Sequence, residues 1–269
     1  MGEYYFELII SPSNSYELFL ELLLSFEDFA VEERKNSIII RDSEDLNPLL
    51  EAVESFAKAI NTPYSYSLKK VKNEDWISKY QNSINPVEVG SFYIRPMWKD
   101  PKKDKIDIII NPALAFGSGH HETTASCLQA LDKYVQAKKR VLDVGCGSGI
   151  LSIASAKKGA IVDICDTDPQ AIESALQNFS FNSVQVKNHW VGSASKSDKK
   201  YDIVIANIIA DIIILIKKDL KDRLDDNGIL ILSGIIDDYF HKVKDNFSEF
   251  NIIENITKGE WHTLVLKKG

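Results

Sequence analysis

Apolar residues gather in short runs along the C-terminal half of the chain, and amphipathic stretches separate these runs. An apolar run of about four to eight residues bounded by turn residues is typical of a buried parallel strand, whereas apolar residues three and four apart indicate a helix. Strands that alternate with helices form a doubly wound α/β sheet. Because only Lys258 and Gly259 connect the last two runs, we expect the final strand to be reversed. The predicted strands of this seven-stranded sheet cover residues 140–144, 161–165, 184–191, 201–206, 228–233, 250–257 and 261–266.

The first third of the chain predicts a smaller domain of a different kind. Its order of elements is strand, helix, strand, strand, helix, strand, which is typical of a ferredoxin-like α+β sandwich. Many functions occur on this fold, so the topology alone does not indicate one. The expected strands cover residues 4–10, 29–32, 37–41 and 64–71, and the expected helices cover 15–26 and 47–59.

Between these two parts, residues 73–90 predict a short linker that begins with helical character. Runs at 89–96 and 106–110 predict a further pair of strands, and a helix is expected from Thr123 to about Tyr134. The pattern therefore predicts an N-terminal domain at 1–72, the linker, and a C-terminal domain at 91–269.

Composition narrows the class of protein. Hydrophobic content of 44% and charged content of 26% are typical of a soluble globular protein. The N-terminus lacks the features of a secretory signal, and the most apolar run, 203–216, is too short and too polar to span a membrane. Cys127, Cys146 and Cys165 lack metal-ligand spacing, so we expect reduced thiols in a cytoplasmic protein.

The net charge of −7 lies entirely in the first third of the chain. Residues 1–82 hold 8 Lys and Arg against 15 Asp and Glu, whereas the two kinds balance in the rest of the chain. An acidic surface repels nucleic-acid phosphates and attracts a basic partner, although a merely solvated surface would have the same composition. We therefore expect no direct nucleic-acid binding.

The most informative motif is a glycine-rich turn between a predicted strand and a predicted helix, DVGCGSG at 143–149. Glycine lets a ligand approach the backbone closely, and the N-terminus of the following helix offers free amides. The spacing G-x-G-x-G differs from the G-x-G-x-x-G of dinucleotide-binding turns. A turn of this kind also occurs for packing alone. We take Gly145 and Gly147 as candidate cofactor contacts, and Asp143 as a secondary candidate that would attract a cationic ligand such as S-adenosylmethionine.

Two carboxylates follow the next predicted strand. Asp166 lies at the end of the strand, about twenty residues after the glycines, where nucleotide-binding α/β folds hold ribose hydroxyls. Asp168 precedes Pro169, and this pair is typical of a helix N-cap. We therefore expect Asp166 to bind the cofactor and Asp168 to cap the helix.

Asn207 follows the predicted strand at 201–206, at the edge where open α/β sheets bind ligands. Its side-chain carbonyl can accept a hydrogen bond from an amine and so aim the nitrogen lone pair at a methyl carbon. An Asn that merely ends a strand is the alternative. The glycine turn and Asp166 favour a catalytic and cofactor-binding role for Asn207.

The segment NPALAFGSGHHETT at 111–124 predicts a loop that leads into a helix. An apolar loop with glycine hinges can fold over a cofactor and exclude water. Thr124 is a candidate hydrogen-bonding contact to the cofactor, Phe116 is a candidate stacking partner, and His121 is a secondary candidate. The His-His-Glu run does not match H-E-x-x-H, and adjacent side chains do not converge on one ion, so no metal site is expected.

Together these motifs resemble one family, the bacterial methyltransferases of ribosomal protein L11. The resemblance implies a class I S-adenosylmethionine-dependent methyltransferase fold, with a ferredoxin-like N-terminal domain that recognises the ribosomal protein. It also implies cofactor contacts from Thr124, Gly145, Asp166 and Asn207. The residues that carry it are NPALAFGSGHHETT, VLDVGCGSGILSIA, DTDPQA, ANIIA and LSGI, all within residues 111–235.

The loop departs from the family's usual F-G-T-G-T-H-P-T-T run. Ser118 and His120 replace threonines, and Glu122 replaces a proline. Ser118 keeps a hydroxyl, and a Glu near a helix N-terminus is favourable, so the changes bear on the motion of the loop more than on cofactor binding.

The expected reaction is direct transfer of a methyl group from S-adenosylmethionine to lysine or N-terminal amines of the basic ribosomal protein L11. An amine methyltransferase of the same fold that acts on a different protein or small molecule is the alternative. A dinucleotide-dependent oxidoreductase is disfavoured by the glycine spacing, and a non-catalytic cofactor-binding protein is disfavoured by the intact Asn207 and loop motifs.

Overall fold

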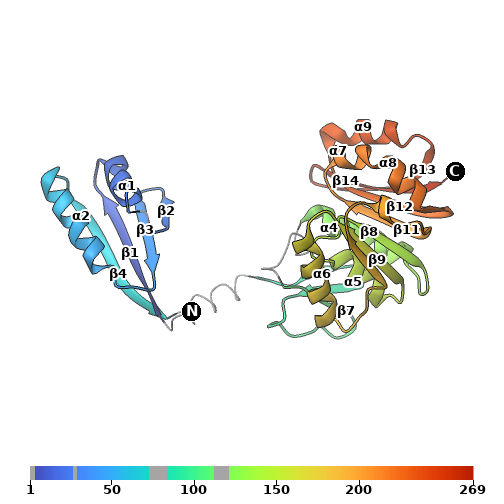
Figure 1. Ribbon diagram of the computed structural model, residues 1–269, viewed down its shortest axis with the longest axis horizontal. Coiled ribbons are helices and arrows are strands. Elements are labelled where there is room, and N and C mark those ends of the chain that lie inside the picture. The colour runs from blue at the N-terminus through green and yellow to red at the C-terminus, as the bar shows by residue number, and fades with distance from the viewer. Residues whose placement is uncertain (1–3, 27–28, 73–83, 112–120, 269) are drawn as a thin grey trace. The chain divides into compact units, whose positions relative to one another are not determined.

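The computed structural model describes residues 4–26, 29–72, 84–111 and 121–268. The chain forms two compact units, Met1–Ile84 and Asn85–Gly269 (Figure 1). Each has a hydrophobic core of its own, so each is described separately.

The first unit is an α+β sandwich. Its strands form an antiparallel sheet in the order β2-β3-β1-β4, and α1 and α2 pack on one face of that sheet. In α1 the apolar residues Phe19 and Leu23 lie four apart, so both face the sheet, where they join Leu8 and Ile40 in the core. The predicted ferredoxin-like topology is confirmed. Its elements are β1 (Tyr4–Pro12), α1 (Tyr16–Leu24), β2 (Val31–Arg34), β3 (Ser37–Asp42), α2 (Asn47–Ala59) and β4 (Tyr64–Lys72).

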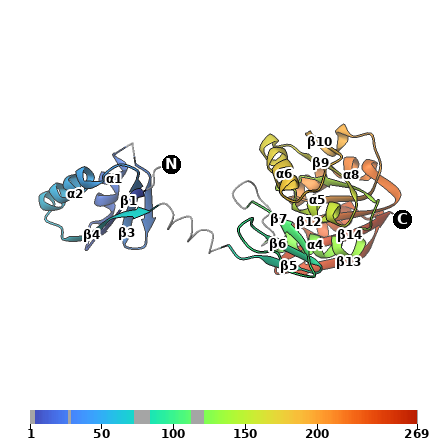
Figure 2. The same ribbon diagram turned by 90° about the horizontal axis from the view of Figure 1, so that it is seen from below.

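The second unit begins with a three-stranded sheet beside α4 and α5 (Figure 2) and continues into an alternation of strands and helices. Its elements are β5 (Val87–Val89), β6 (Phe92–Arg95), β7 (Ile106–Ile109), α4 (Glu122–Tyr134), β8 (Arg140–Val144), α5 (Ile150–Lys157), β9 (Ile161–Asp166), α6 (Pro169–Phe181), β10 (Asn188–Val191), the 3-10 turn η1 (Ala194–Lys196), β11 (Tyr201–Asn207), α7 (Ala210–Leu215), α8 (Lys217–Arg223), β12 (Leu224–Ile236), α9 (Asp237–Asn246), β13 (Phe250–Lys258) and β14 (Trp261–Lys268).

The large sheet of this unit has seven strands in the order β10-β9-β8-β11-β12-β14-β13. Neighbouring strands are parallel except that β14 is antiparallel to both β12 and β13. The predicted doubly wound sheet with a reversed last strand is therefore confirmed. The chain leaves β8 toward β9 on one side and returns to β11 on the other, and this reversal of strand order opens a crevice at the carboxyl edge.

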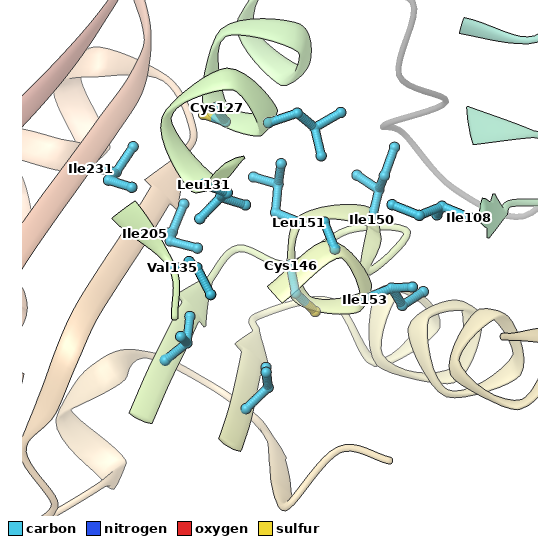
Figure 3. Close-up of a cluster of buried hydrophobic side chains, with 14 of the residues drawn as sticks. Ile108, Cys127, Leu131, Val135, Cys146, Ile150, Leu151, Ile153, Ile205 and Ile231 are labelled. Carbon is cyan, nitrogen blue, oxygen red and sulfur yellow. The ribbon is translucent and has the colours of Figure 1, made fainter. Parts of the chain in front are cut away.

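Helices cover both faces of the large sheet. Residues of α4, α5 and α6 join one core cluster, and residues of α7, α8 and α9 join the other (Figure 1). Because successive strand residues point to opposite faces, Ile205 belongs to the first cluster and Val204 to the second. Figure 3 shows part of the first cluster, in which Leu131 of α4 and Ile153 of α5 lie among the strand residues. This packing fixes both ends of the glycine-rich turn, since the turn joins β8 to α5.

The predicted strand at 89–96 is wrong in one respect, because a turn divides it into β5 and β6. Gly90 adopts φ +55°, and a Cβ there would lie 2.3 Å from Oδ2 of Asp132. The backbone N–H and the hydroxyl of Ser91 donate to the Asp132 carboxylate at 2.8 and 2.6 Å. A contact from α4 therefore sets this turn. The strand expected at 184–191 is also shorter, since only its second half, β10, is extended.

Candidate active site

A cavity of about 510 Å³ lies at the carboxyl edge of the large sheet, where β8, β9 and β11 end. A cavity of this size accommodates a small-molecule cofactor. Five of the residues predicted from the sequence line it, namely Gly145, Gly147, Asp166, Asn207 and His121. The other predicted residues differ. Thr124 and Asp143 are buried beside the cavity without lining it, and Phe116 lies outside the described residues.

The glycine turn supplies the floor of the cavity. Gly145 and Gly147 have φ values of +74° and +51°, in the left-handed region that favours glycine. A Cβ on Gly145 would lie 2.4 Å from Cγ2 of Ile208, which also lines the cavity. Any side chain at 145 would therefore clash with the segment that follows Asn207, so glycine is required for the turn to lie this close to that segment.

Asp166 and Asp168 differ in position. The prediction that Asp168 caps the following helix is confirmed. One carboxylate oxygen of Asp168 accepts from the backbone N–H of Gln170 at 2.8 Å, which makes it the N-cap of α6. Asp166 lies at the end of β9 and lines the cavity. Its Oδ2 accepts from the backbone N–H of Gly147 at 3.0 Å, and its Oδ1 accepts from the backbone N–H of Asp168 at 3.0 Å. These two bonds fix the carboxylate at the wall of the cavity.

Asp143 lies beneath the turn rather than in the cavity. It is 1% exposed, and its Oδ2 accepts from the hydroxyl of Ser152 at 2.5 Å. Burial raises the pKa of this carboxyl to about 6, and the nearby negative charge of Asp166 acts in the same direction. Asp143 therefore ties β8 to α5.

His121 and the threonines begin helix α4. Nδ1 of His121 accepts from the backbone N–H of Thr123 at 3.3 Å, so the imidazole is the N-cap of the helix. The same ring meets Trp261 edge-on, with 4.9 Å between centroids. Thr123 lines the cavity, whereas Thr124 is 1% exposed behind it. In the part of the chain that the structure describes, the hydroxyl oxygen of Thr124 has no hydrogen-bond partner.

Several residues that line the cavity were not predicted from the sequence as site residues. Gly234 adopts φ +85°, and a Cβ there would lie 2.2 Å from the carbonyl oxygen of Ile208. Trp261 begins β14, and Thr167 and Ser193 follow β9 and β10. Gly234 directly follows the predicted strand at 228–233, and a glycine in that position is a local signal of a turn close to a ligand. The additional lining residues include Thr123, Thr167, Ser193, Ile208, Gly234 and Trp261.

Within the described ranges, no three His, Cys, Asp or Glu side chains gather as metal ligands. No helix in the same ranges is long and apolar enough to cross a membrane.

Comparison with known proteins identifies the family. The profile of the family described as "Ribosomal protein L11 methyltransferase (PrmA)" matches residues 13–269. The chain belongs to this family. The resemblance predicted from the motifs is thereby confirmed, and with it the methyltransferase class and the use of S-adenosylmethionine.

Relatives among the ribosomal protein L11 methyltransferases cover the whole chain. The protein of that name from a Nitratiruptor species is 50% identical over 273 residues, which cover 99% of this chain and 97% of that protein. The one from Wolinella succinogenes is 48% identical and covers 100% of both chains. The crystal structure of ribosomal protein L11 methylase from Lactobacillus delbrueckii subsp. bulgaricus superposes with a TM-score of 0.65 at 29% identity, and covers 69% of this chain and 100% of that one.

Proposed function

We propose that this chain transfers methyl groups from S-adenosylmethionine to lysine side chains, or to the N-terminal amine, of ribosomal protein L11. One observation carries the proposal beyond family membership. Gly145, Asp166 and Asn207 lie at the carboxyl ends of three adjacent strands, β8, β9 and β11, and line a single cavity. The first two suit the cofactor, and the third suits an amine that approaches it.

The residues that line the cavity suit S-adenosylmethionine. Gly145 and Gly147 leave the floor open to close approach of a ligand, and Asp166 offers carboxylate oxygens to ribose hydroxyls. The hydroxyl of Thr124 is buried beside the cavity and has no partner in the described ranges, and the cofactor contact expected of it stays a proposal. S-adenosylmethionine, when bound, supplies a methyl group on a positively charged sulfur. We also propose, from the sequence, that Phe116 stacks on the cofactor.

Asn207 orients the acceptor. Its side-chain oxygen accepts a hydrogen bond from the incoming amine, so that the nitrogen lone pair is aimed at the methyl carbon. Holding two reacting atoms in line converts a bimolecular step into one within a complex, which lowers the barrier by up to about 7–11 kcal/mol. Val144 and Ile208 are apolar parts of the same wall and exclude water from it.

The acceptor amine has to lose its proton before it reacts. A lysine with its ordinary pKa of about 10.4 costs roughly 4–5 kcal/mol to deprotonate at pH 7. Entry into a partly apolar cavity lowers this pKa, because desolvation disfavours the charged form. We propose that the proton passes to water before the amine is enclosed, and that no side chain of the site has to act as a base.

We also propose that the two units have different functions, one in substrate binding and the other in methyl transfer. Residues 1–72 bind the ribosomal protein, and 91–269 carry out the transfer. The linker predicted at 73–90 ends before β5 (Val87–Val89), which belongs to the second unit. The negative charge of the first third of the chain supports this division, since the ribosomal protein is expected to be basic. The same charge opposes direct nucleic-acid binding, and we place the enzyme in the cytoplasm, where its substrate is made.

The test is intact-mass spectrometry of ribosomal protein L11 after incubation with the enzyme and S-adenosylmethionine. Increments of about 14 Da, mapped to lysines or the N-terminal amine, are expected because each methyl group replaces one proton. Asn207→Ala should lower kcat by about 100-fold or more while S-adenosylhomocysteine still binds. If the wild-type enzyme binds S-adenosylhomocysteine but adds no mass, the acceptor is a different amine. If Asn207→Ala changes neither binding nor turnover, the role of Asn207 is wrong.

A further inference from the structure

Helix α7 has an unusual composition for a short surface helix. Its sequence is ADIIIL, and Ile208 and Ile209 precede it. The inner side of the helix is accounted for, because Ala210 and Ile213 are buried in the second core cluster. The outer side is also apolar. A helix that is apolar all round is normally covered on all sides.

Three side chains form that outer side, and we call them the α7 rim: Ile209, Ile212 and Leu215. They are 68%, 39% and 76% exposed, and their spacing of three places them along one side of the helix. The only ionisable residue of the helix is Asp211, whose carboxylate pairs with Nζ of Lys242 at 2.7 Å. The rim side chains are therefore apolar, and the exposed Asp211–Lys242 pair lies beside them.

The α7 rim borders the mouth of the cavity. Ile209 and Ile212 line the cavity and are also exposed to solvent, so they lie where the cavity opens. Leu215 does not line the cavity but continues the same surface outward. Asn207, which we propose orients the acceptor, is only two residues before Ile209. The apolar surface thus starts beside the proposed acceptor position and extends away from it.

We infer that the α7 rim is the surface on which the apolar part of the acceptor segment packs: the methylene stem of the acceptor lysine and an apolar residue beside it in the protein substrate. The inference rests on the proposed function. The occupant follows from the position of the rim, because an acceptor reaches the methyl group only through the mouth of the cavity. A lysine side chain suits such a path, since its methylenes pack on apolar surface while its nitrogen continues inward. Contiguous exposed apolar residues at a site mark a recognition surface.

The test compares Leu215→Ser with Leu215→Met, using ribosomal protein L11 as substrate. Leu215 lies outside the cavity lining and is largely exposed, so neither change should alter the fold or the Kd for S-adenosylhomocysteine by more than about twofold. Leu215→Ser should raise KM for the ribosomal protein about fivefold to tenfold, because the buried contact of one leucine is lost. Leu215→Met should stay near wild type, because methionine keeps the apolar area.

A matched control comes from the opposite edge of the same sheet. Ile161 is 46% exposed at the amino end of β9, whereas the cavity lies at the carboxyl end. Ile161→Ser should leave KM for the ribosomal protein unchanged, since this exposed isoleucine is far from the mouth. Equal KM values for the Leu215→Ser, Ile161→Ser and wild-type enzymes would overturn the inference while leaving the proposed function intact.

Other results separate the remaining possibilities. If the wild-type enzyme binds S-adenosylhomocysteine but does not methylate the ribosomal protein, the proposed function fails and the occupant named here fails with it. Light scattering coupled to size exclusion should show the same molecular mass for the wild type and Leu215→Ser. A wild-type dimer that becomes a monomer in Leu215→Ser would show that a second copy of this chain covers the α7 rim, and would overturn the inference.

Discussion

The carboxylate of Asp166 accepts a hydrogen bond from the backbone N–H of Gly147 at 3.0 Å, so the acid that ends β9 and the glycine turn after β8 are joined directly. The two motifs are 19 residues apart in sequence. One side chain therefore has two functions in the proposed site, since it offers an oxygen to the cofactor and also holds the turn that forms the floor of the cavity.

Replacing Asp166 should therefore weaken cofactor binding. Asp166→Ala removes the proposed ribose acceptor and the bond to Gly147. We expect Kd for S-adenosylhomocysteine to rise about 10-fold to 100-fold, because a hydrogen bond to a charged group contributes about 1.5–3 kcal/mol. Isothermal titration calorimetry measures this. Asp168→Ala is the matched control, since it removes the N-cap of α6 and should cost about 1 kcal/mol of stability without changing Kd. Equal Kd values for the two variants would contradict the proposed contact.

A second connection holds the turn from the side. The amide of Asn178, which is fully buried on α6, donates to the carbonyl oxygen of Ser148 at 2.9 Å and accepts from the backbone N–H of Asn111 at 3.0 Å. Asn178→Ala leaves both backbone groups without these bonds. We expect a loss of about 1–3 kcal/mol in the free energy of unfolding of the second unit, since two buried hydrogen bonds of about 0.5–1.5 kcal/mol each are removed.

Urea unfolding followed by tryptophan fluorescence checks this expectation. Asn178→Asp is the informative comparison, because it keeps an acceptor for Asn111 but places a second oxygen where the donor to Ser148 was. It should destabilise the unit and weaken S-adenosylhomocysteine binding, as Asn178→Ala does. A variant with unchanged unfolding and unchanged binding would show that these two bonds do not hold the turn.

Local signals in the sequence were sufficient for much of the fold and part of the site. The apolar runs predicted the strands of the large sheet, and the pair Asp168-Pro169 predicted the cap of α6. Gly145, Asp166 and Asn207 lie at the ends of neighbouring strands because parallel strands end at one edge. The strand runs, their ends and the cap depend only on residues close together in the chain.

Features that depend on distant contacts could not be predicted in this way. The turn at Gly90 is set by Asp132 on α4. Trp261 reaches the cavity because β14 inserts between β12 and β13, and the sequence shows only that β14 is reversed. Asp143 was a candidate for contact with a cationic ligand, but the fold buries it against Ser152. Burial and strand order result from packing of the whole unit, which no short segment determines.

The two units should separate binding of the cofactor from recognition of the protein. Deleting residues 1–72 leaves the second unit with its complete sheet and both core clusters. We expect the truncated enzyme to bind S-adenosylhomocysteine with a Kd within about twofold of wild type, but to lose methylation of ribosomal protein L11, because the acidic recognition surface is gone. Calorimetry and intact-mass spectrometry measure the two properties. Full methylation by the truncated enzyme would show that the first unit does not recognise the substrate.

The buried carboxyl of Asp143 should make the stability of the second unit depend on pH. Its pKa is raised from the ordinary value of 3.8 to about 6, chiefly by burial. The folded state therefore binds the proton more tightly than the unfolded state does. The resulting stabilisation is complete below about pH 4 and is lost as the pH rises to about 6, with a total of about 3 kcal/mol.

Asp143→Asn isolates this effect, because asparagine stays neutral and still offers an oxygen to the hydroxyl of Ser152. The free energy of unfolding of the second unit is measured in urea from pH 4.5 to 7.5 for both proteins. Other titrating groups are common to the two, so they cancel in the difference. We expect the wild type to lose about 2 kcal/mol relative to Asp143→Asn across this range, with most of the loss below pH 6.5. A difference that stays constant with pH would mean that Asp143 keeps its ordinary pKa, and that its burial beneath the glycine turn is offset by contacts that favour the ionised form.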